Sequence, residues 1–228
     1  MKTVFVDDYN YTFTPGDVLE KMGMPRDNSF SANIAEMMEK LEPIAKPRAF
    51  FMETPIEART EDSVTILGQT FHSTALVRNF TDVETVYPFL CTCGKELAEY
   101  CDSLEDIVEQ YACDAIMEFY LRKASLALTE SLSNFLETDG LTSSVNPGSL
   151  VDWSITEQQE LFTVFGENAD KIMVNLSETS LMYPVKSVSG IRYPSKKEFK
   201  NCELCQRKNC PTRESEFDQD LFIKTLHE

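Results

Sequence analysis

The sequence predicts an α+β domain in which long helices pack on an antiparallel or mixed sheet. Of its 228 residues, 42% are hydrophobic and only eight are glycine, as in globular chains that bury a sizeable core. Helical and strand-like patterns follow one another in blocks, in the order α, β, α, β. This order favours an α+β arrangement over a regular βαβ repeat.

The first 47 residues are predicted to form a helical lead-in. A short strand over residues 3–8 precedes a helix from Asp17 to Met22, which begins after Pro15 and Gly16. A second helix from Ser31 to about Leu41 ends before Pro43 and Pro47. We expect the α+β core over residues 48–200 and a cysteine-rich tail over residues 201–228.

The core is predicted to begin with β-structure, because residues 48–94 are rich in β-branched and aromatic side chains between turn signals. Strands are expected over residues 48–54, 63–67, 70–74 and 85–94. Pro88 indicates an edge position or a bulge for the last of these. Its period of two places Cys91 and Cys93 on one face near the end of the strand.

Helices are predicted over residues 95–101, 104–136 and 156–165. The apolar stripe of the long second helix is expected to be buried and comprises Val108, Tyr111, Ala112, Ala115, Ile116, Phe119, Leu126 and Phe135. Cys113 lies beside this stripe and is expected to be a packed thiol. Ser154 and Glu157 predict a capping box for the third helix. Residues 171–176 and 188–193 are expected to be strands.

The charge and the chain's first residues exclude several classes of protein. A net charge of -17 argues against nucleic acid or an anionic membrane as the main partner. No apolar run approaches the ~20 residues of a membrane span, and acids near the first residue argue against a secretory signal. We therefore expect a cytoplasmic protein, in which disulfides are rare. His72 and His227 are the only histidines, and no nucleophile-elbow motif accompanies them.

One segment of this acidic chain is basic. Residues 186–213 hold eight bases and two acids, for a net charge of +6, so the remaining residues sum to -23. Such a segment suits docking of an acidic partner, for example an acidic electron carrier. The alternative interpretation is a solvated, lysine-rich loop.

The tail contains three closely spaced cysteines, Cys202, Cys205 and Cys210. Their spacing, Cys-x2-Cys-x4-Cys before a proline, is typical of metal ligands in intracellular chains, although it is not a standard ferredoxin spacing. A thiolate-only site needs a fourth ligand, which Cys93 or Cys91 could supply. An iron-sulfur cluster, a zinc ion and free thiols remain the alternatives, because spacing does not identify the metal.

The run from Ser177 to Gly190 reads Ser-Glu-Thr-Ser-Leu-Met-Tyr-Pro-Val-Lys-Ser-Val-Ser-Gly. It resembles the signature of the reactivation domain of cobalamin-dependent methionine synthase. The resemblance covers roughly residues 80–195 and implies that fold in a separately encoded subunit, because no cobalamin-binding or homocysteine module precedes it. It implies an accessory role in the reductive methylation, by S-adenosylmethionine, of an oxidised corrinoid on a partner methyltransferase. Whether the chain itself is an enzyme stays open.

The resemblance also implies the site residues. The family's methyl-donor motif, Arg-x-x-x-Gly-Tyr, matches residues 144–149, where Gly148 is kept but Ser144 and Ser149 replace the arginine and the tyrosine. Serine cannot replace a charge-assisted contact to the donor's carboxylate worth roughly 1.5–3 kcal/mol.

Other residues of the signature extend the expected site. Glu178 could hold the donor's ribose or amine, or be a surface carboxylate. Tyr183, Lys186 and Ser187 are expected to face the corrinoid partner, or simply to form a strand and a turn at Pro184. Two other roles remain open: a noncatalytic corrinoid-protein-binding module with a structural zinc or iron-sulfur site, and a zinc-stabilised interaction protein.

Overall fold

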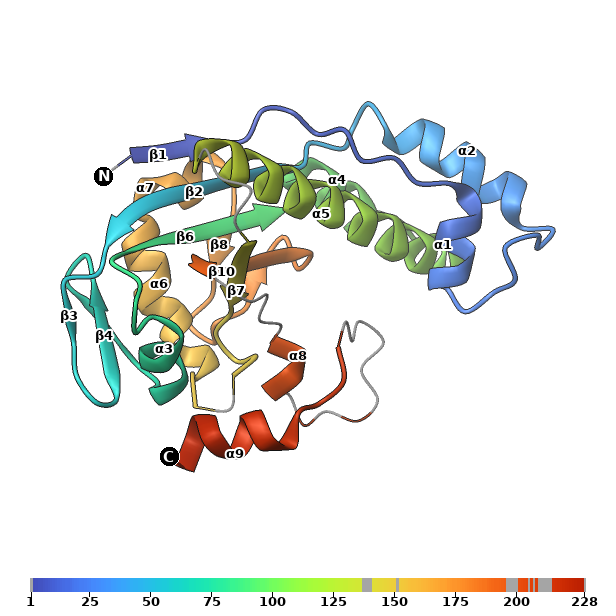
Figure 1. The fold of residues 1–228 in the computed structure, drawn as a ribbon. Coiled ribbons are helices and arrows are strands. Elements are labelled where there is room, and N and C mark those ends of the chain that lie inside the picture. The colour runs from blue at the N-terminus through green and yellow to red at the C-terminus, as the bar shows by residue number, and fades with distance from the viewer. Residues whose placement is uncertain are drawn as a thin grey trace.

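A five-stranded antiparallel sheet forms the centre of the structure, a computed structural model that describes residues 2–136, 141–150, 152–195, 201–204, 206, 208 and 215–227. Its strands, in spatial order, are β1 (Lys2–Phe5), β2 (Arg48–Pro55), β6 (Thr85–Thr92), β10 (Ser187–Ser195) and β7 (Leu141–Val145) (Figure 1). Every neighbouring pair is antiparallel. The predicted α+β class is confirmed.

Smaller strands and the helices surround this sheet. A three-stranded sheet contains β3 (Ala58–Arg59), β4 (Ser63–Ile66) and β5 (Gln69–His72), and a two-stranded one contains β8 (Asn175–Leu176) and β9 (Met182–Tyr183). The helices are α1 (Pro15–Lys21), α2 (Ser31–Leu41), α3 (Thr74–Asn79), α4 (Lys95–Asp102), α5 (Ile107–Phe135), the 3-10 turn η1 (Ile155–Glu157), α6 (Gln158–Phe165), α7 (Glu167–Lys171), α8 (Asn201–Leu204) and α9 (Gln219–His227). In this described part of the chain, no helix is long and apolar enough to cross a membrane.

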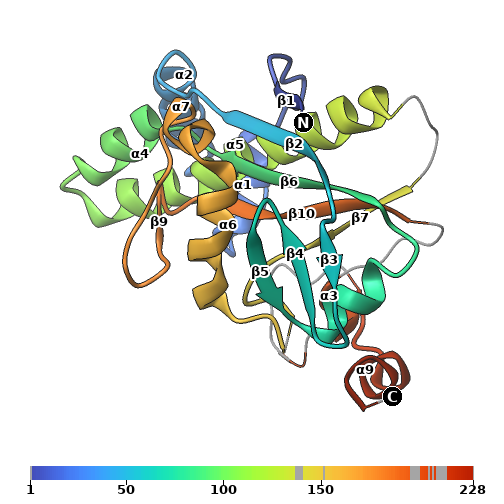
Figure 2. The same cartoon turned by 90° about the vertical axis from the view of Figure 1, so that its left-hand side faces the viewer.

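The two faces of the central sheet bury different helices, because successive side chains of a strand point to opposite faces. Phe50 on β2 stacks edge-on with Phe165 of α6, at 5.3 Å between ring centroids. The next residue, Phe51, belongs to the cluster that contains Leu128 and Leu132 of α5. Figure 2 shows α6 and the three-stranded sheet in front of the central sheet.

The N-terminal residues belong to the same packed unit as the core. Helix α1 begins at a capping box between Thr14 and Asp17 and ends against α2. Both helices contribute to one apolar cluster with α4 and α5, which includes Leu19, Ile34 and Ile116. Strand β1 pairs with β2. The stretch predicted as a helical lead-in therefore packs directly on the core.

The long predicted helix is confirmed as α5, which begins after Asp106, whose carboxylate accepts the backbone N–H groups of Val108 and Glu109. The predicted stripe is only partly buried: Val108, Tyr111 and Leu126 are exposed, whereas Ala112, Ala115 and Ile116 are buried. The first half of α5 packs against α1, α2 and α4 and its second half packs on the sheet. A single stripe cannot describe a helix whose buried face changes partner along its length.

Neither the edge position nor the bulge predicted at Pro88 is present, because β6 lies between β2 and β10 and its register with β2 keeps the same offset on both sides of Pro88. Proline has no backbone N–H to donate. The β2–β6 register accordingly runs from Arg48–Thr92 to Phe51–Phe89 and resumes only at Thr54–Val86, which leaves a gap in the pairing around Pro88. On its other side Pro88 lies opposite Ile191 of β10.

Two further expectations are corrected. Ser154 caps η1 by accepting the N–H of Thr156, but Glu157 does not complete a capping box. Its carboxylate instead accepts the backbone N–H of His72 on β5 at 2.9 Å. The strand predicted over residues 171–176 is shorter, because α7 extends to Lys171 and β8 contains only residues 175–176.

Candidate functional site

The two stretches that carry the family resemblance lie side by side. Strand β7, which contains Ser144, pairs with β10, so that Ser144 lies opposite Arg192. The side-chain amide of Asn146 donates to the carbonyl oxygen of Ser189 at 2.7 Å. Gly190 makes this approach feasible, since a Cβ there would lie 2.5 Å from the carbonyl oxygen of Val145.

The loop predicted to hold the methyl donor is closed by its own contacts. The N–H of Gly148 donates to the carbonyl oxygen of Trp153 at 2.8 Å, and the N–H of Ser149 donates to that of Asn146 at 3.0 Å. A Cβ on Gly148 would lie 3.1 Å from the Cβ of Ile155. The space beside Gly148 is therefore used by Ile155. The hydroxyl of Ser144 donates to the side-chain oxygen of Asn146 at 3.4 Å.

Glu178 lies exposed in the turn that joins β8 to β9. Helix α6 anchors this turn at both ends. The amide of Gln159 donates to the carbonyl oxygen of Ser177 at 2.7 Å, and that of Gln158 donates to the carbonyl oxygen of Ser180 at 3.1 Å. The carboxylate of Glu178 therefore stands on a fixed turn.

A buried polar chain that the sequence did not reveal connects the two stretches. Gln158 is 3% exposed, and its side-chain oxygen accepts the hydroxyl of Ser189 at 3.0 Å. The carbonyl oxygen of Ser189 accepts a hydrogen bond from the side-chain amide of Asn146. The side-chain amide of Gln158 also donates to the carbonyl oxygen of Ser180. Buried polar groups are stable only when bonded in this way. Ser189 belongs to the signature run, but no sequence pattern identified Gln158 as its partner.

Tyr183 and Lys186 lie elsewhere, against α4 and α5. The hydroxyl of Tyr183 donates to Asp102 at 2.9 Å. Burial and the Asp102 carboxylate raise the pKa of Tyr183 to about 12. The ammonium of Lys186 lies 2.9 Å from Asp114 and 3.9 Å from Glu118. Part of the basic segment predicted from the sequence is thus paired with acids of α5.

The six predicted cofactor-binding residues lie in separate parts of the structure. Lys186 precedes β10, and Ser144 lies opposite Arg192, six residues further along. At the usual rise of a strand this separation is about 20 Å. The structure brings Ser144, Gly148 and Ser149 together, and it brings Tyr183 near Lys186, but it keeps the two groups apart.

Between its anchors the signature exposes apolar side chains. We call residues 177–186 the signature loop. Its Leu181 and Val185 are 61% and 62% exposed. The hydroxyl of Ser187, predicted to face a partner, is instead buried and donates to the carbonyl oxygen of Pro184 at 2.7 Å. The loop thus presents two large apolar groups from a fixed base.

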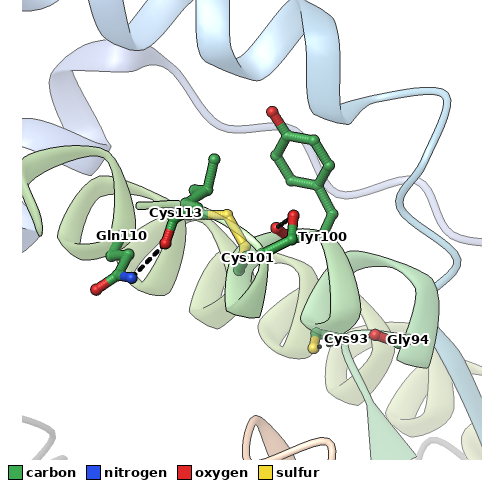
Figure 3. The surroundings of a disulfide bond; sticks show 8 residues. Cys93, Gly94, Tyr100, Cys101, Gln110 and Cys113 are labelled. Atoms are coloured by element: carbon green, nitrogen blue, oxygen red, sulfur yellow. Dashed lines mark hydrogen bonds between the residues drawn. A yellow bond between two sulfur atoms is a disulfide. The ribbon is translucent and has the colours of Figure 1, made fainter. Parts of the chain in front are cut away.

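The expectation of no disulfide, with Cys113 as a packed thiol, is wrong. Cys101 at the end of α4 is bonded to Cys113 of α5, with 5.9 Å between their Cα atoms (Figure 3). The short connection between the two helices brings the residues together, although they are 12 positions apart in the sequence. The expectation of a cytoplasmic protein was based on charge and on export signals, and neither of these reveals which cysteines are in contact.

The predicted metal ligands fall in different places. Cys205, Cys210 and the side chain of Cys202 lie outside the described residues. Cys93 is fully buried, and burial raises the pKa of its thiol to about 12, which disfavours the thiolate that a metal requires. Burial also raises the pKa of the Cys91 thiol to about 12.

The described part of the tail lies at the other end of the sheet from Cys93. Burial and the nearby Glu203 carboxylate of α8 raise the pKa of Tyr193, which lies on β10 opposite the start of β6. Cys93 follows the end of β6, which is about 20 Å away at the usual rise of a strand. The described residues contain no group of three or more Cys, His, Asp or Glu arranged to hold a metal ion.

Comparison with known proteins gives a likeness in fold. No protein-family model matches this chain, and no curated protein matches it. Among solved structures it is similar to one described as "Crystal Structure of the MetH Reactivation Domain bound to AdoHcy". The two share 16% sequence identity with a TM-score of 0.64, over 89% of this chain and 82% of that chain. At this identity the likeness shows the fold: the chain has the fold of the MetH reactivation domain.

Proposed function

We propose that this protein is an accessory protein that supports reductive reactivation of a cobalamin- or corrinoid-dependent methyltransferase, such as methionine synthase. The fold likeness extends over 89% of the chain to a reactivation domain that binds AdoHcy. The observation that carries the proposal is the signature loop, which holds Leu181 and Val185 more than half exposed between ends anchored at Ser177 and Lys186. Exposed apolar groups on a fixed base are typical of a docking surface.

In this proposal the chain binds and orients its partner. The corrinoid belongs to the partner methyltransferase and supplies the methyl-transfer chemistry when it is bound there. The signature loop provides the contact surface, and the chain of bonds from Asn146 through Ser189 to Gln158 keeps it at a fixed position relative to the Ser144–Ser149 loop. When the two proteins bind in one orientation, the reacting groups are already positioned relative to each other. Such positioning is the usual contribution of a docking surface to a reaction.

The double variant Leu181→Asp/Val185→Asp is expected to bind more weakly to a cobalamin-dependent methionine synthase that lacks its own reactivation domain. Charge on two central apolar contacts typically costs about 2 kcal/mol or more, which is at least a ~30-fold higher Kd. Calorimetric titration of the two purified proteins measures this. Leu126→Asp is the matched control, because Leu126 is 45% exposed on α5, outside the signature loop.

If the double variant and the control bind equally well, the signature loop is not the docking surface. If the unmodified chain does not bind a corrinoid protein at all, the proposed function is wrong.

A second role, that of a noncatalytic corrinoid-protein-binding module, is favoured by the serines at positions 144 and 149. S-adenosylmethionine is expected to give no saturable heat in calorimetry up to about 1 mM, because the charged partner for its carboxylate is missing. The variant Ser144→Arg/Ser149→Tyr supplies the family's side chains and tests the same site. Micromolar binding by the unmodified chain would instead favour direct delivery of the methyl donor, with Glu178 as the remaining contact.

The tail completes the proposal. Cys202, Cys205 and Cys210 remain the proposed ligands of a zinc ion or an iron-sulfur cluster, and the position of Cys93 argues for a fourth ligand from elsewhere. An iron-sulfur cluster would suit an acidic electron carrier as a second partner. The cytoplasmic location predicted from the sequence is part of the same proposal.

A further inference from the structure

Two contacts hold the C-terminal half of the signature loop against the helices. Tyr183 donates to Asp102, the last residue of α4, and Lys186 pairs with Asp114 of α5. The side chain of Asp114 is 53% exposed, and ion pairs as exposed as this contribute little on their own. Together with the backbone bond from Cys93 to the carbonyl oxygen of Lys186, the two carboxylates therefore position the side of the loop that faces α4 and α5.

The disulfide fixes the position of the two carboxylates relative to each other. Asp102 directly follows Cys101, and Asp114 directly follows Cys113. The covalent bond between the two cysteines ties the end of α4 to the second turn of α5 (Figure 3). Each anchor of the loop is therefore the immediate neighbour of a bonded cysteine.

The packing around the disulfide leaves room for movement once the bond is broken. A cavity of 420 Å³ lies between α2, α4 and the start of α5, lined by side chains that include Phe30, Met37, Tyr100 and Val108. Tyr100 is the residue before Cys101. The connection from Ser103 to Asp106 is largely exposed. Without the bond, the end of α4 has open space on one side and an exposed connection on the other.

We propose that the oxidation state of the Cys101–Cys113 pair regulates the signature loop: the disulfide holds the loop in its docking position, and reduction releases it. A dithiol reductant breaks the S–S bond, each sulfur takes up one proton, and the reductant is oxidised to its own disulfide. Cys101 is 5% exposed and Cys113 is fully buried, so attack falls on the sulfur of Cys101. The meaning of the release for partner binding rests on the proposed function, but the release itself does not.

Hydrogen exchange of the full chain, with and without dithiothreitol, tests the proposal. Met182 and Tyr183 pair with β8, and reduction is expected to speed exchange of amides in the signature loop by about tenfold, through easier local opening. Amides in the middle of β10, such as that of Ile191, are expected to be unchanged. Equal exchange of the signature loop in the two states would overturn the proposal.

Variants separate the disulfide from other effects of the reductant. Cys101→Ser/Cys113→Ser is expected to show the fast exchange of the reduced protein and no response to dithiothreitol. Tyr183→Phe keeps the disulfide but removes one anchor, so the oxidised variant is expected to exchange faster than the oxidised parent. A response to dithiothreitol that persists in the double serine variant would contradict the proposal, because it would come from other cysteines.

Partner binding distinguishes the two proposals. Reduction is expected to raise the Kd for a corrinoid methyltransferase by about fivefold or more, because a released loop must be ordered again on binding. If exchange responds to reduction but no corrinoid protein binds in either state, the switch stands and the proposed function fails. If the partner binds equally well in both states and exchange does not respond, the switch fails and the proposed function stands.

Discussion

Gly94→Ala is expected to destabilise the protein by about 3–5 kcal/mol, because an alanine at this position combines backbone strain with steric overlap. Gly94 precedes α4 with φ +103 and ψ 139, a region that is almost restricted to glycine. A Cβ there would also overlap the backbone carbonyl of Lys46, in the loop before β2. A backbone carbonyl cannot rotate away as the end of a long side chain can.

Urea denaturation of the purified variant measures the loss, and Gly23→Ala is the matched control. Gly23 has φ +76, but a Cβ there would meet no atom within 4 Å. The control therefore carries only the backbone cost, which is about 1–2 kcal/mol. Equal losses at the two positions would show that the overlap with Lys46 costs nothing.

The effect of Gly94→Ala is also expected to reach the functional segment. Cys93, directly before Gly94, donates its N–H to the carbonyl oxygen of Lys186 at 3.0 Å. A shift of the chain at Gly94 would therefore move the end of β6, the start of α4 and the end of the signature loop together. Faster hydrogen exchange at Lys186 and Ser187 in this variant would report that coupling.

Hydrophobic periodicity and helix-breaking residues correctly predicted those helices whose boundaries depend only on nearby residues in the sequence. The boundaries of α2 and α5 match the predicted helices closely, since helical spacing and the breaker residues that follow a helix are local properties of the sequence. Pro88 could not be placed correctly, because the strand order depends on contacts between distant segments. Proline fitted into the middle of the sheet through a gap in pairing to β2 alone.

The candidate site shows the same division. The order of residues in the signature run pointed to the fold, and the fold likeness supports it. The partners of that run could not be predicted, because Asp102, Asp114 and Gln158 reach it only through the packing of helices that are distant from it in the sequence. The Cys101–Cys113 bond was missed for a related reason, since it depends on how two helices meet.

Gly190→Ala is expected to cost about 2–3 kcal/mol and to loosen β7 from the sheet. Gly190 lies within β10, and a Cβ there would lie 2.5 Å from the carbonyl oxygen of Val145, 2.5 Å from the side-chain nitrogen of Asn146 and 2.9 Å from the Cε1 atom of Phe89. Neighbours on both sides of the strand would have to move. The hydrogen bond from Asn146 to Ser189, which joins the two candidate stretches, is expected to be lost.

Denaturation measures the cost, and a double-mutant cycle with Asn146→Ala identifies its source. If Gly190→Ala displaces the Asn146 side chain, the double variant loses less stability than the sum of the single variants, because the bond to Ser189 is already lost in Gly190→Ala. Gly16→Ala is the control, because a Cβ there would make ordinary contacts at 3.4 Å or more in α1 and is expected to be neutral or slightly stabilising. Strict additivity would show that the carbonyl of Val145 or the ring of Phe89 limits the space. In that case glycine at position 190 serves the pairing of β7 with β10 rather than the polar link through Asn146.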